Sequence, residues 1–241
     1  MILHNELVID GVRTSSFPFK VIVQESPVLQ ISASKSQLLN HDGISGAIMQ
    51  TNRHRDTIQK KYSISLVGAT ELQVYEFAAL LCREKFWLEN EQVKETRLWC
   101  YKVDSMEAPR DAFGVVTFEV TFICHPTKFF KESETKIFTS SGVLRLKGSA
   151  LAFPRIKVNA QTGSQTSFTI GSQVIRFEMA SESAIMTNNP DNPSFLSSKN
   201  QPIRWSGDFI SLDANQKEKN IGIVLGPGVR SLEIETVWGW A

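Results

Sequence analysis

Four histidines are the residues best suited to acid–base or metal chemistry near neutral pH. They stand apart along the chain, at His4, His41, His54 and His125. His125 directly follows Cys124 in a predicted strand, where neighbouring side chains point to opposite faces. This placement argues against a nucleophile–base pair. We interpret all four histidines as loop or surface residues.

Three cysteines, Cys82, Cys100 and Cys124, lie far apart, and no two have the C-x-x-C spacing. An odd number of cysteines without paired spacing predicts neither a disulfide framework nor a zinc site. We interpret them as buried free thiols that pack like small apolar residues.

The acidic residues Asp104, Glu107 and Asp111 are grouped, as the carboxylates of a glycosidase would be, but they surround a predicted turn and are better explained as solvated groups. The chain has no Gly-x-Ser-x-Gly elbow, phosphate-binding loop, dinucleotide fingerprint or His-Glu-x-x-His motif. The sequence therefore predicts a protein that is not an enzyme and that uses no cofactor or metal.

Three tryptophans, Trp205, Trp238 and Trp240, offer a different chemistry, because exposed indole rings stack on sugars. Trp238 and Trp240 flank Gly239 and would share one face of an extended strand. The alternative interpretation is that these rings seal a sandwich core or a domain interface. A carbohydrate-binding β-sandwich protein is thus one hypothesis for the function.

The densest basic run contains Arg53 and Arg55, followed by Lys60 and Lys61. It fits a solvated loop, an ion pair between subunits, or a basic lumen that faces a polyanion. The whole chain has a formal net charge of +1, which does not suggest a strongly basic nucleic-acid-binding face.

The chain's size and composition are those of a globular protein. Its 241 residues, 41% hydrophobic and 21% charged, allow one large or two small domains. The N-terminus lacks the pattern of a signal peptide, and no apolar run approaches the roughly 20 residues that span a bilayer. We expect synthesis in the cytoplasm and no membrane insertion.

The stretch Phe113–Cys124 has the strongest strand pattern, with strict alternation of side chains. One face is fully apolar and must cover a core: Val116, Phe118, Val120 and Phe122. The other face is half polar, which makes it a candidate subunit contact through Thr117, Glu119 and Thr121. Because proline cannot donate to a strand ladder, we expect the strand to end at Pro126.

One predicted helix precedes this strand. Thr70 and Gln73 form a capping-box pattern, and the helix is predicted from Glu71 to about Lys85. We expect its apolar stripe, led by Leu72 and Tyr75, to pack on the apolar face of the strand.

Residues 33–57 are rich in turn signals and predict a long connection, either a solvated loop or an arm that reaches a neighbouring subunit. Asn40, Asp42, Arg53 and Arg55 are its candidate interface residues. After Thr139–Gly142, only short strand patterns with turns between them follow, typical of a β-sandwich. We predict a mainly β, α+β chain with one helix, divided into residues 1–138 and 139–241.

The order of these features resembles the distal tail protein (Dit) family of long-tailed bacteriophages. The features are the Asp10-Gly11 turn, the loop Lys35–Gly46 ahead of the strand Tyr62–Leu66, the helix from Thr70, and the strand that runs into Cys124-His125-Pro126. Ile203–Asp213 and Leu225–Val229 are similar to the family's second domain. The loop departs from the family, because Asn40-His41-Asp42-Gly43 replaces a more basic, proline-containing version.

The resemblance implies a virion structural protein of the tail tip. Its N-terminal domains would assemble into a ring, six-membered in the family, around a lumen through which DNA passes. The ring would join the tail tube protein to a tail-associated lysin or fibre protein. The C-terminal β-sandwich would be galectin-like and sometimes attach receptor-binding proteins.

Overall fold

The computed structural model describes residues 5–51, 54–111 and 113–241, and it is mainly β with one α-helix in those ranges. This agrees with the predicted fold class. The chain forms two compact units, residues 1–129 with Ala241, and Phe130–Trp240. The division falls before the expected boundary at 138/139, because β10 (Glu134–Phe138) pairs with a strand of the second unit.

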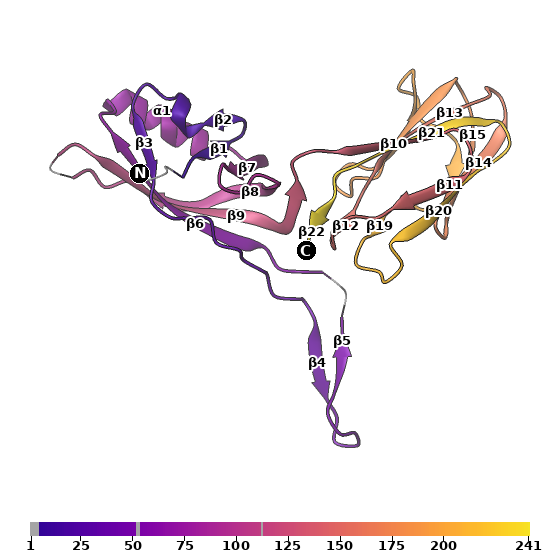
Figure 1. The fold of residues 1–241 in the computed structure, drawn as a ribbon, viewed down its shortest axis with the longest axis horizontal. Coiled ribbons are helices and arrows are strands. Elements are labelled where there is room, and N and C mark those ends of the chain that lie inside the picture. The colour runs from indigo at the N-terminus through magenta and orange to yellow at the C-terminus, as the bar shows by residue number, and fades with distance from the viewer. Residues whose placement is uncertain (1–4, 52–53, 112) are drawn as a thin grey trace. The chain divides into compact units, whose positions relative to one another are not determined.

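The first unit is built on one antiparallel sheet with strand order β2-β1-β7-β8-β9-β6-β3 (Figure 1). In that order the strands are β2 (Val12–Arg13), β1 (Leu7–Ile9), β7 (Phe86–Asn90), β8 (Thr96–Glu107), β9 (Val116–Phe130), β6 (Ile58–Val67) and β3 (Lys20–Val23).

β9 confirms the predicted alternation, since Val116, Phe118, Val120 and Phe122 are all 2% exposed or less. The strand does not end at Pro126 as expected, but continues to Phe130. The ladder with β6 stops at the pair Ile58–Cys124. Pro126 therefore lies beyond that ladder, where its missing N–H leaves no β6 carbonyl without a partner.

The helix α1 (Glu71–Leu81) begins with the predicted capping box, in which Thr70 and Gln73 exchange hydrogen bonds. It ends at Leu81 rather than near Lys85, whose positive φ of 57° is incompatible with a continuing helix.

The helix packs on the sheet through a face other than the predicted one. Leu72 and Tyr75 are 69% and 63% exposed, so they do not cover β9. Phe77, Leu80 and Leu81 are buried instead, and the ring of Phe77 lies 5.5 Å from that of Phe118. The helix stripe was misassigned because α1 is apolar around most of its circumference.

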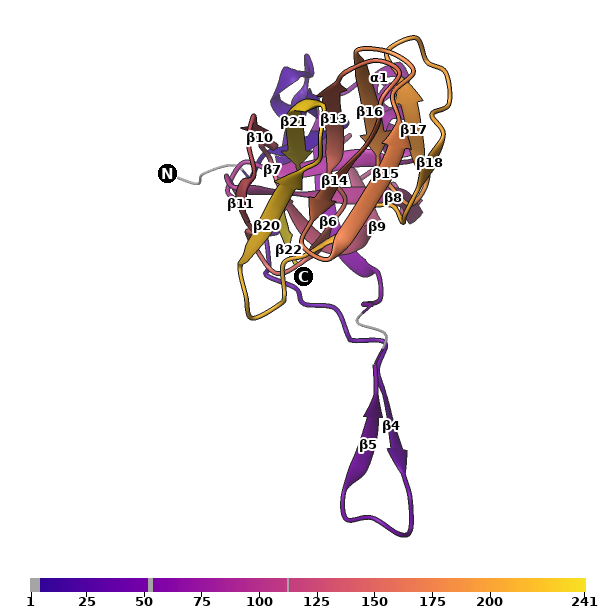
Figure 2. The same cartoon turned by 90° about the vertical axis from the view of Figure 1, so that its right-hand side faces the viewer.

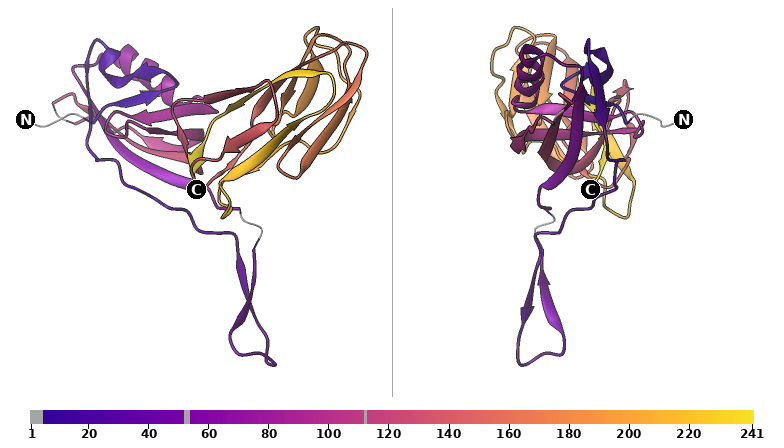
Figure 3. Two further views of the ribbon diagram at one scale, coloured as in Figure 1. Left: turned by 45° about the vertical axis from the view of Figure 1, so that its right-hand side comes forward. Right: turned by 90° about the vertical axis from the view of Figure 1, so that its left-hand side faces the viewer.

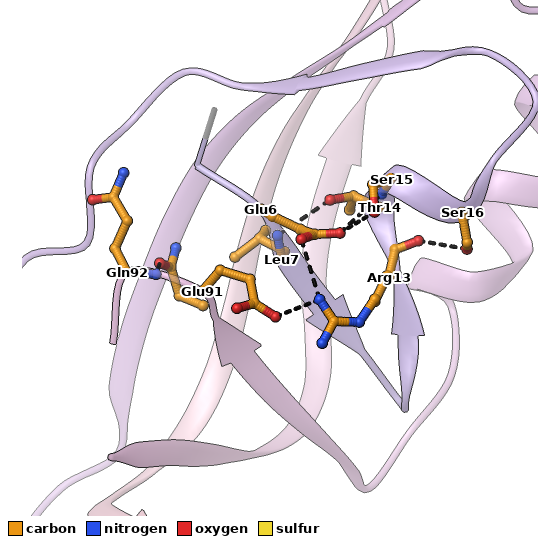
Figure 4. Close-up of polar contacts among 9 residues, drawn as sticks. Glu6, Leu7, Arg13, Thr14, Ser15, Ser16, Glu91 and Gln92 are labelled. Carbon is orange, nitrogen blue, oxygen red and sulfur yellow. Dashed lines mark hydrogen bonds and ion pairs between the residues drawn. The ribbon is translucent and has the colours of Figure 1, made fainter. Parts of the chain in front are cut away.

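The first hairpin of the sheet turns at Asp10 and Gly11, whose φ angles of 51° and 78° fit a type I′ turn. A 3₁₀ turn, η1 (Thr14–Ser16), follows β2. Thr14 Oγ1 accepts from Leu7 N at 3.2 Å, which ties η1 back to β1 (Figure 4).

A separate hairpin, β4 (Gln37–Asn40) and β5 (Ala47–Gln50), occupies much of the long connection predicted at 33–57. It forms its own two-stranded sheet (Figure 3). An antiparallel bridge between Ser34 and Arg55 closes its base. We call residues 35–54 of this connection the arm.

The second unit is a sandwich of two five-stranded sheets (Figure 2). One sheet contains β10, β21 (Val229–Thr236), β13 (Arg155–Ala160), β16 (Ser183–Thr187) and β17 (Ser194–Ser197); the other contains β11 (Gly142–Arg145), β20 (Asn220–Leu225), β14 (Gln165–Ile170), β15 (Gln173–Glu178) and β18 (Trp205–Ser206). The shorter strands are β12 (Leu151–Ala152), β19 (Leu212–Asp213) and β22 (Gly239–Trp240).

Gly171-Ser172 has the Gly-first sequence of a two-residue type II′ hairpin turn, and this hairpin is present, with Ile170 paired to Gln173. Gly171 has a φ of 61°, as the first central residue of a type II′ turn requires. The inward faces of both sheets share one core, which includes Phe168, Ile234 and Trp238. Within the described ranges, no helix is long and apolar enough to cross a membrane.

Candidate functional site

Among the described residues, no group of three or more His, Cys, Asp or Glu side chains could hold a metal ion. Cys100 and Cys124 are buried as predicted, but Cys82 is exposed. A hydrogen bond to Cys100, with burial, raises the pKa of the Cys124 thiol well above its usual value, so Cys124 is not a thiolate nucleophile at neutral pH.

Two residues of the predicted acidic group have local partners, and Asp104 pairs with Lys102 at 3.7 Å. Asp111 Oδ1 accepts from both Phe113 N and Val115 N at 2.8 Å, which makes Asp111 a turn residue. Glu6 and Glu91 approach one another on the first unit, but Arg13 lies between them (Figure 4). Its guanidinium nitrogen is 3.3 Å from Glu6 and 2.6 Å from Glu91. A carboxylate pair bridged in this way is a surface ion cluster.

The three tryptophans do not form a common platform. Trp238 is 1% exposed, and its indole Nε1 donates to Glu134 Oε2 at 2.8 Å. Trp205 is half-buried, with its ring 4.9 Å from that of Phe209. Trp240 is 50% exposed. Trp238 continues the alternation of β21 into the core, as the alternative interpretation expected, whereas Trp240 breaks it and is exposed. The two rings therefore do not present a shared face to a sugar.

The candidate interface residues of β9 belong to a polar ladder on the face away from the core. Glu119 accepts from Ser63 Oγ at 2.7 Å, and Thr117 is 2.9 Å from Ser65 Oγ. Thr117 and Thr121 are half-buried, whereas Glu119 is exposed. The ladder joins β6 to β9, so these side chains stabilise the sheet in addition to any contact with another subunit.

The candidate residues of the arm are differently placed. Asn40 in β4 and Asp42 in the turn are both exposed. Arg55 is half-buried at the base, where it donates to Ser32 O at 2.8 Å. Arg53 lies outside the described residues. The structure therefore places Asn40 and Asp42 in the distal part of the arm and Arg55 at its base.

Apolar residues of the arm are the feature that sequence reasoning missed. The cross-strand pairs Leu38–Met49 and Leu39–Ile48 lie on opposite faces of the hairpin. Leu38 and Met49 are 70% and 60% exposed, and Leu39 and Ile48 are 46% and 53% exposed. The sequence signal is two short apolar pairs, Leu38-Leu39 and Ile48-Met49, on either side of the turn residues. The many turn residues of this segment favoured the prediction of a loop instead of a hairpin.

A second missed feature is an aromatic cluster on the outer face of β7, β8 and β9. Trp87 lies 4.8 Å from Trp99 and 5.5 Å from Phe129, measured between ring centroids. The guanidinium of Arg97 stacks 3.9 Å from the centre of the Trp87 ring. In the sequence, the signal for this face is that Trp99 and Tyr101 stand two residues apart, at the spacing of one face of a strand.

Comparison with known proteins identifies the fold. No protein-family model and no curated protein sequence matches the chain. The Dit protein of phage SPP1, described as a paradigm of the hub adsorption apparatus in phages that infect Gram-positive bacteria, matches 97% of this chain and 98% of its own, with a TM-score of 0.72 and 15% identity.

The baseplate of phage P2, solved in its activated conformation with Ca, contains a chain that matches over 98% of both lengths, with a TM-score of 0.53 and 11% identity. Both likenesses cover the two units and the arm together. The chain therefore has the fold of the Dit hub protein along almost its whole length.

Proposed function

We propose that this protein is a structural hub of a phage tail tip, not an enzyme, and that it assembles into a ring. The observation that carries the proposal is the match to the SPP1 Dit protein over 97% of the chain. A shared fold does not by itself transfer a function. The proposal therefore also rests on surfaces of this chain that suit assembly.

The arm is the main such surface. Each face of the hairpin carries an exposed apolar pair, Leu38–Met49 on one and Leu39–Ile48 on the other. An isolated two-stranded hairpin is marginally stable in water. When a partner covers the exposed apolar pairs, the complex is stabilised by about 25 cal/mol per Å² of apolar surface removed from water. Such an arm is suited to insertion between other protein surfaces.

In the proposed assembly, the first unit forms the ring and is the ring-forming domain. The ring is a homohexamer that joins the tail tube protein to a tail-associated lysin or fibre protein. DNA passes through its lumen. The second unit is a galectin-like sandwich that provides an attachment point for receptor-binding proteins, and the protein is located in the virion.

Light scattering coupled to size-exclusion chromatography tests the ring, followed by negative-stain imaging of the oligomer. We expect an oligomer of several subunits with a central hole. A variant with Leu39→Asp and Ile48→Asp should reduce assembly without unfolding the protein, because both side chains are exposed. The matched control is Ile137→Asp, an exposed apolar residue of the second unit.

A protein that stays monomeric at high concentration, alone and with the tail tube and tail-associated proteins added, would contradict the proposal. An oligomer without a central hole would contradict the proposed lumen but would agree with the proposed oligomerisation.

A further inference from the structure

A cavity of about 290 Å³ opens in the first unit where the apolar core ends. Its walls come from the chain before the arm and from β6, β7, β8 and β9. The apolar part includes Leu88, Val93 and Leu98, and the segment Pro27–Leu29 forms one side. Val28 and Leu29 are 73% and 77% exposed, so the rim is also apolar.

Two lysines, Lys60 and Lys128, line this cavity. Lys60 Nζ donates to the carbonyl oxygen of Val28 at 2.5 Å, and Lys128 Nζ approaches that of Pro126 at 3.5 Å. No carboxylate in the part of the chain that the structure describes forms an ion pair with either lysine. Glu89 and Arg97 also line the cavity and pair with each other at 3.9 Å. The cavity thus combines an apolar wall with two lysines that form no ion pair among the described residues.

Burial and nearby positive charge both disfavour the charged forms of these lysines. Burial lowers the pKa of Lys60, and the charge of Lys128 lowers it further. Burial also lowers the pKa of Lys128, and the charge of Arg55 adds to that effect. A carboxylate from a partner stabilises the charged forms of such lysines, and it does so more strongly in a partly desolvated site than in water.

The tip of the arm carries the complementary chemistry. Residues His41–Gly46 form a turn in which Ile44 N donates to His41 O at 3.2 Å and Gly43 N donates to His41 Nδ1 at 3.1 Å. Asp42 is exposed, and Ile44 is 47% exposed. The tip therefore presents a carboxylate and a branched apolar side chain two residues apart.

The arm is long enough to reach a neighbouring molecule. Six residues, 35–40, separate the bridge at Ser34 from the turn at His41–Gly46. An extended chain of that length covers about 20 Å at 3.3 Å per residue. The cavity is at the small end of the range that proteins use for ligands, about 300 Å³ and above, and it suits a few side-chain atoms better than a whole element.

We infer that the arm tip of a second copy of this chain inserts into the Lys60–Lys128 cavity, with Ile44 against the apolar wall and Asp42 between the two lysines. This inference rests on the proposed ring and specifies the contact that links one subunit to the next. The contact is heterologous, tip to cavity, which is the kind that closes into a ring when the rotation between subunits permits it.

Disulfide trapping between two variants of the full chain tests the contact. Ile44→Cys and Val93→Cys are each made with Cys82→Ser, because Cys82 is the exposed native thiol. When the two variants are mixed and oxidised, we expect a cross-linked dimer that is absent from either variant alone. Ile44→Cys mixed with Ile137→Cys is the matched control and should give none.

Charge reversal gives the second readout. Asp42→Lys and Lys128→Glu should each reduce the cross-linking yield and the association constant about tenfold or more, and the two together should restore both. Lys61→Glu, a charge reversal on β6 at a residue that does not line this cavity, should change neither. A thermal melt of each variant checks that it is folded.

No dimer above the control level, or an equal effect of Lys61→Glu and Lys128→Glu, would overturn the inference. The size of the wild-type oligomer separates the two proposals. If the oligomer forms and these variants do not affect it, the ring stands and the tip binds elsewhere. If no oligomer forms, with or without the added tail proteins, the proposed function fails as well.

Discussion

The sheet beneath α1 and the hairpin of the arm are both antiparallel strand pairs with apolar cross-strand contacts, yet they differ in what covers them. In the sheet, Ile64 pairs with Phe118, and the two side chains are 0% and 2% exposed. In the hairpin, Leu39 pairs with Ile48, and the two are 46% and 53% exposed. Similar cross-strand apolar pairs are therefore buried in the core of the first unit and exposed on the arm.

The difference shows which apolar residues the fold needs. A fully buried Phe or Ile side chain contributes about 1.5–3 kcal/mol by leaving water, and deleting it also leaves a cavity. The exposed apolar pairs of the hairpin contribute little of this burial free energy to the stability of a single chain. Their apolar character is therefore best explained by burial against another protein, as the proposed ring requires.

One aspartate substitution in each region tests this comparison most strongly. Phe118→Asp places a carboxylate in the packed core beside Phe77, where a charge without a partner costs several kcal/mol in addition to the lost packing. We expect no soluble folded protein. Leu39→Asp should leave the melting temperature within about 2 °C of the wild-type value, because the side chain is already in water.

Soluble yield, circular dichroism and thermal melting measure both effects. If Leu39→Asp unfolded the first unit, the arm would be a part of the core, and the contrast between the two regions would be lost.

The second unit offers the same contrast at two tryptophans. Trp238 is 1% exposed and Trp240 is 50% exposed. Trp238→Ala should lower the free energy of unfolding by about 3–5 kcal/mol, since it removes a large buried ring. Trp240→Ala should cost less than about 1 kcal/mol. Denaturant titration of each variant compares the two, and equal losses would contradict the assignment of Trp238 to the core.

The elements that the sequence predicted well are those in which local pattern and tertiary packing agree. The apolar face of β9, the capping box at Thr70 and the turns at Asp10-Gly11 and Gly171-Ser172 depend on period-two alternation or on backbone preferences that few residues satisfy. These signals are local and are present in the sequence itself.

The predictions that the structure corrected depend on neighbours that are remote in the chain. Whether Pro126 ends a strand depends on where β6 stops beside it. Which side of α1 is buried depends on the sheet beneath it, since both sides are apolar. The cavity with Lys60 and Lys128 brings together residues 68 positions apart (128 minus 60), and no local pattern predicts such a meeting.

The apolar arm could have been predicted in part. Leu38-Leu39 and Ile48-Met49 stand at equal distances from the midpoint of the turn His41–Gly46, which is the pattern of a hairpin. The sequence does not show that both faces stay exposed, because exposure depends on the absence of other elements beside the hairpin.

A smaller loss than that of Trp238→Ala is expected at the polar partner of this buried tryptophan. Glu134 accepts from Trp238 Nε1 and pairs with Lys147 at 3.0 Å, while its side chain is 22% exposed. Burial alone would raise the pKa of Glu134, but the hydrogen bonds from Lys147 and Trp238 and the nearby lysine charges outweigh it. The pKa therefore lies below its usual value of 4.5.

A carboxylate with a lowered pKa in the folded state stabilises the protein above its unfolded-state pKa, and this contribution disappears as the pH falls through the folded-state value. Glu134→Gln should thus lower the stability of the second unit by about 1 kcal/mol at pH 7 and by progressively less below about pH 4.5. Lys147→Met should behave in the same way, because it removes the same ion pair. Thermal melts of the wild type and both variants between pH 7 and pH 3 measure the difference. A loss that stayed constant down to pH 3 would mean that Glu134 supports Trp238 by shape and hydrogen bonding alone, without a contribution from its charge.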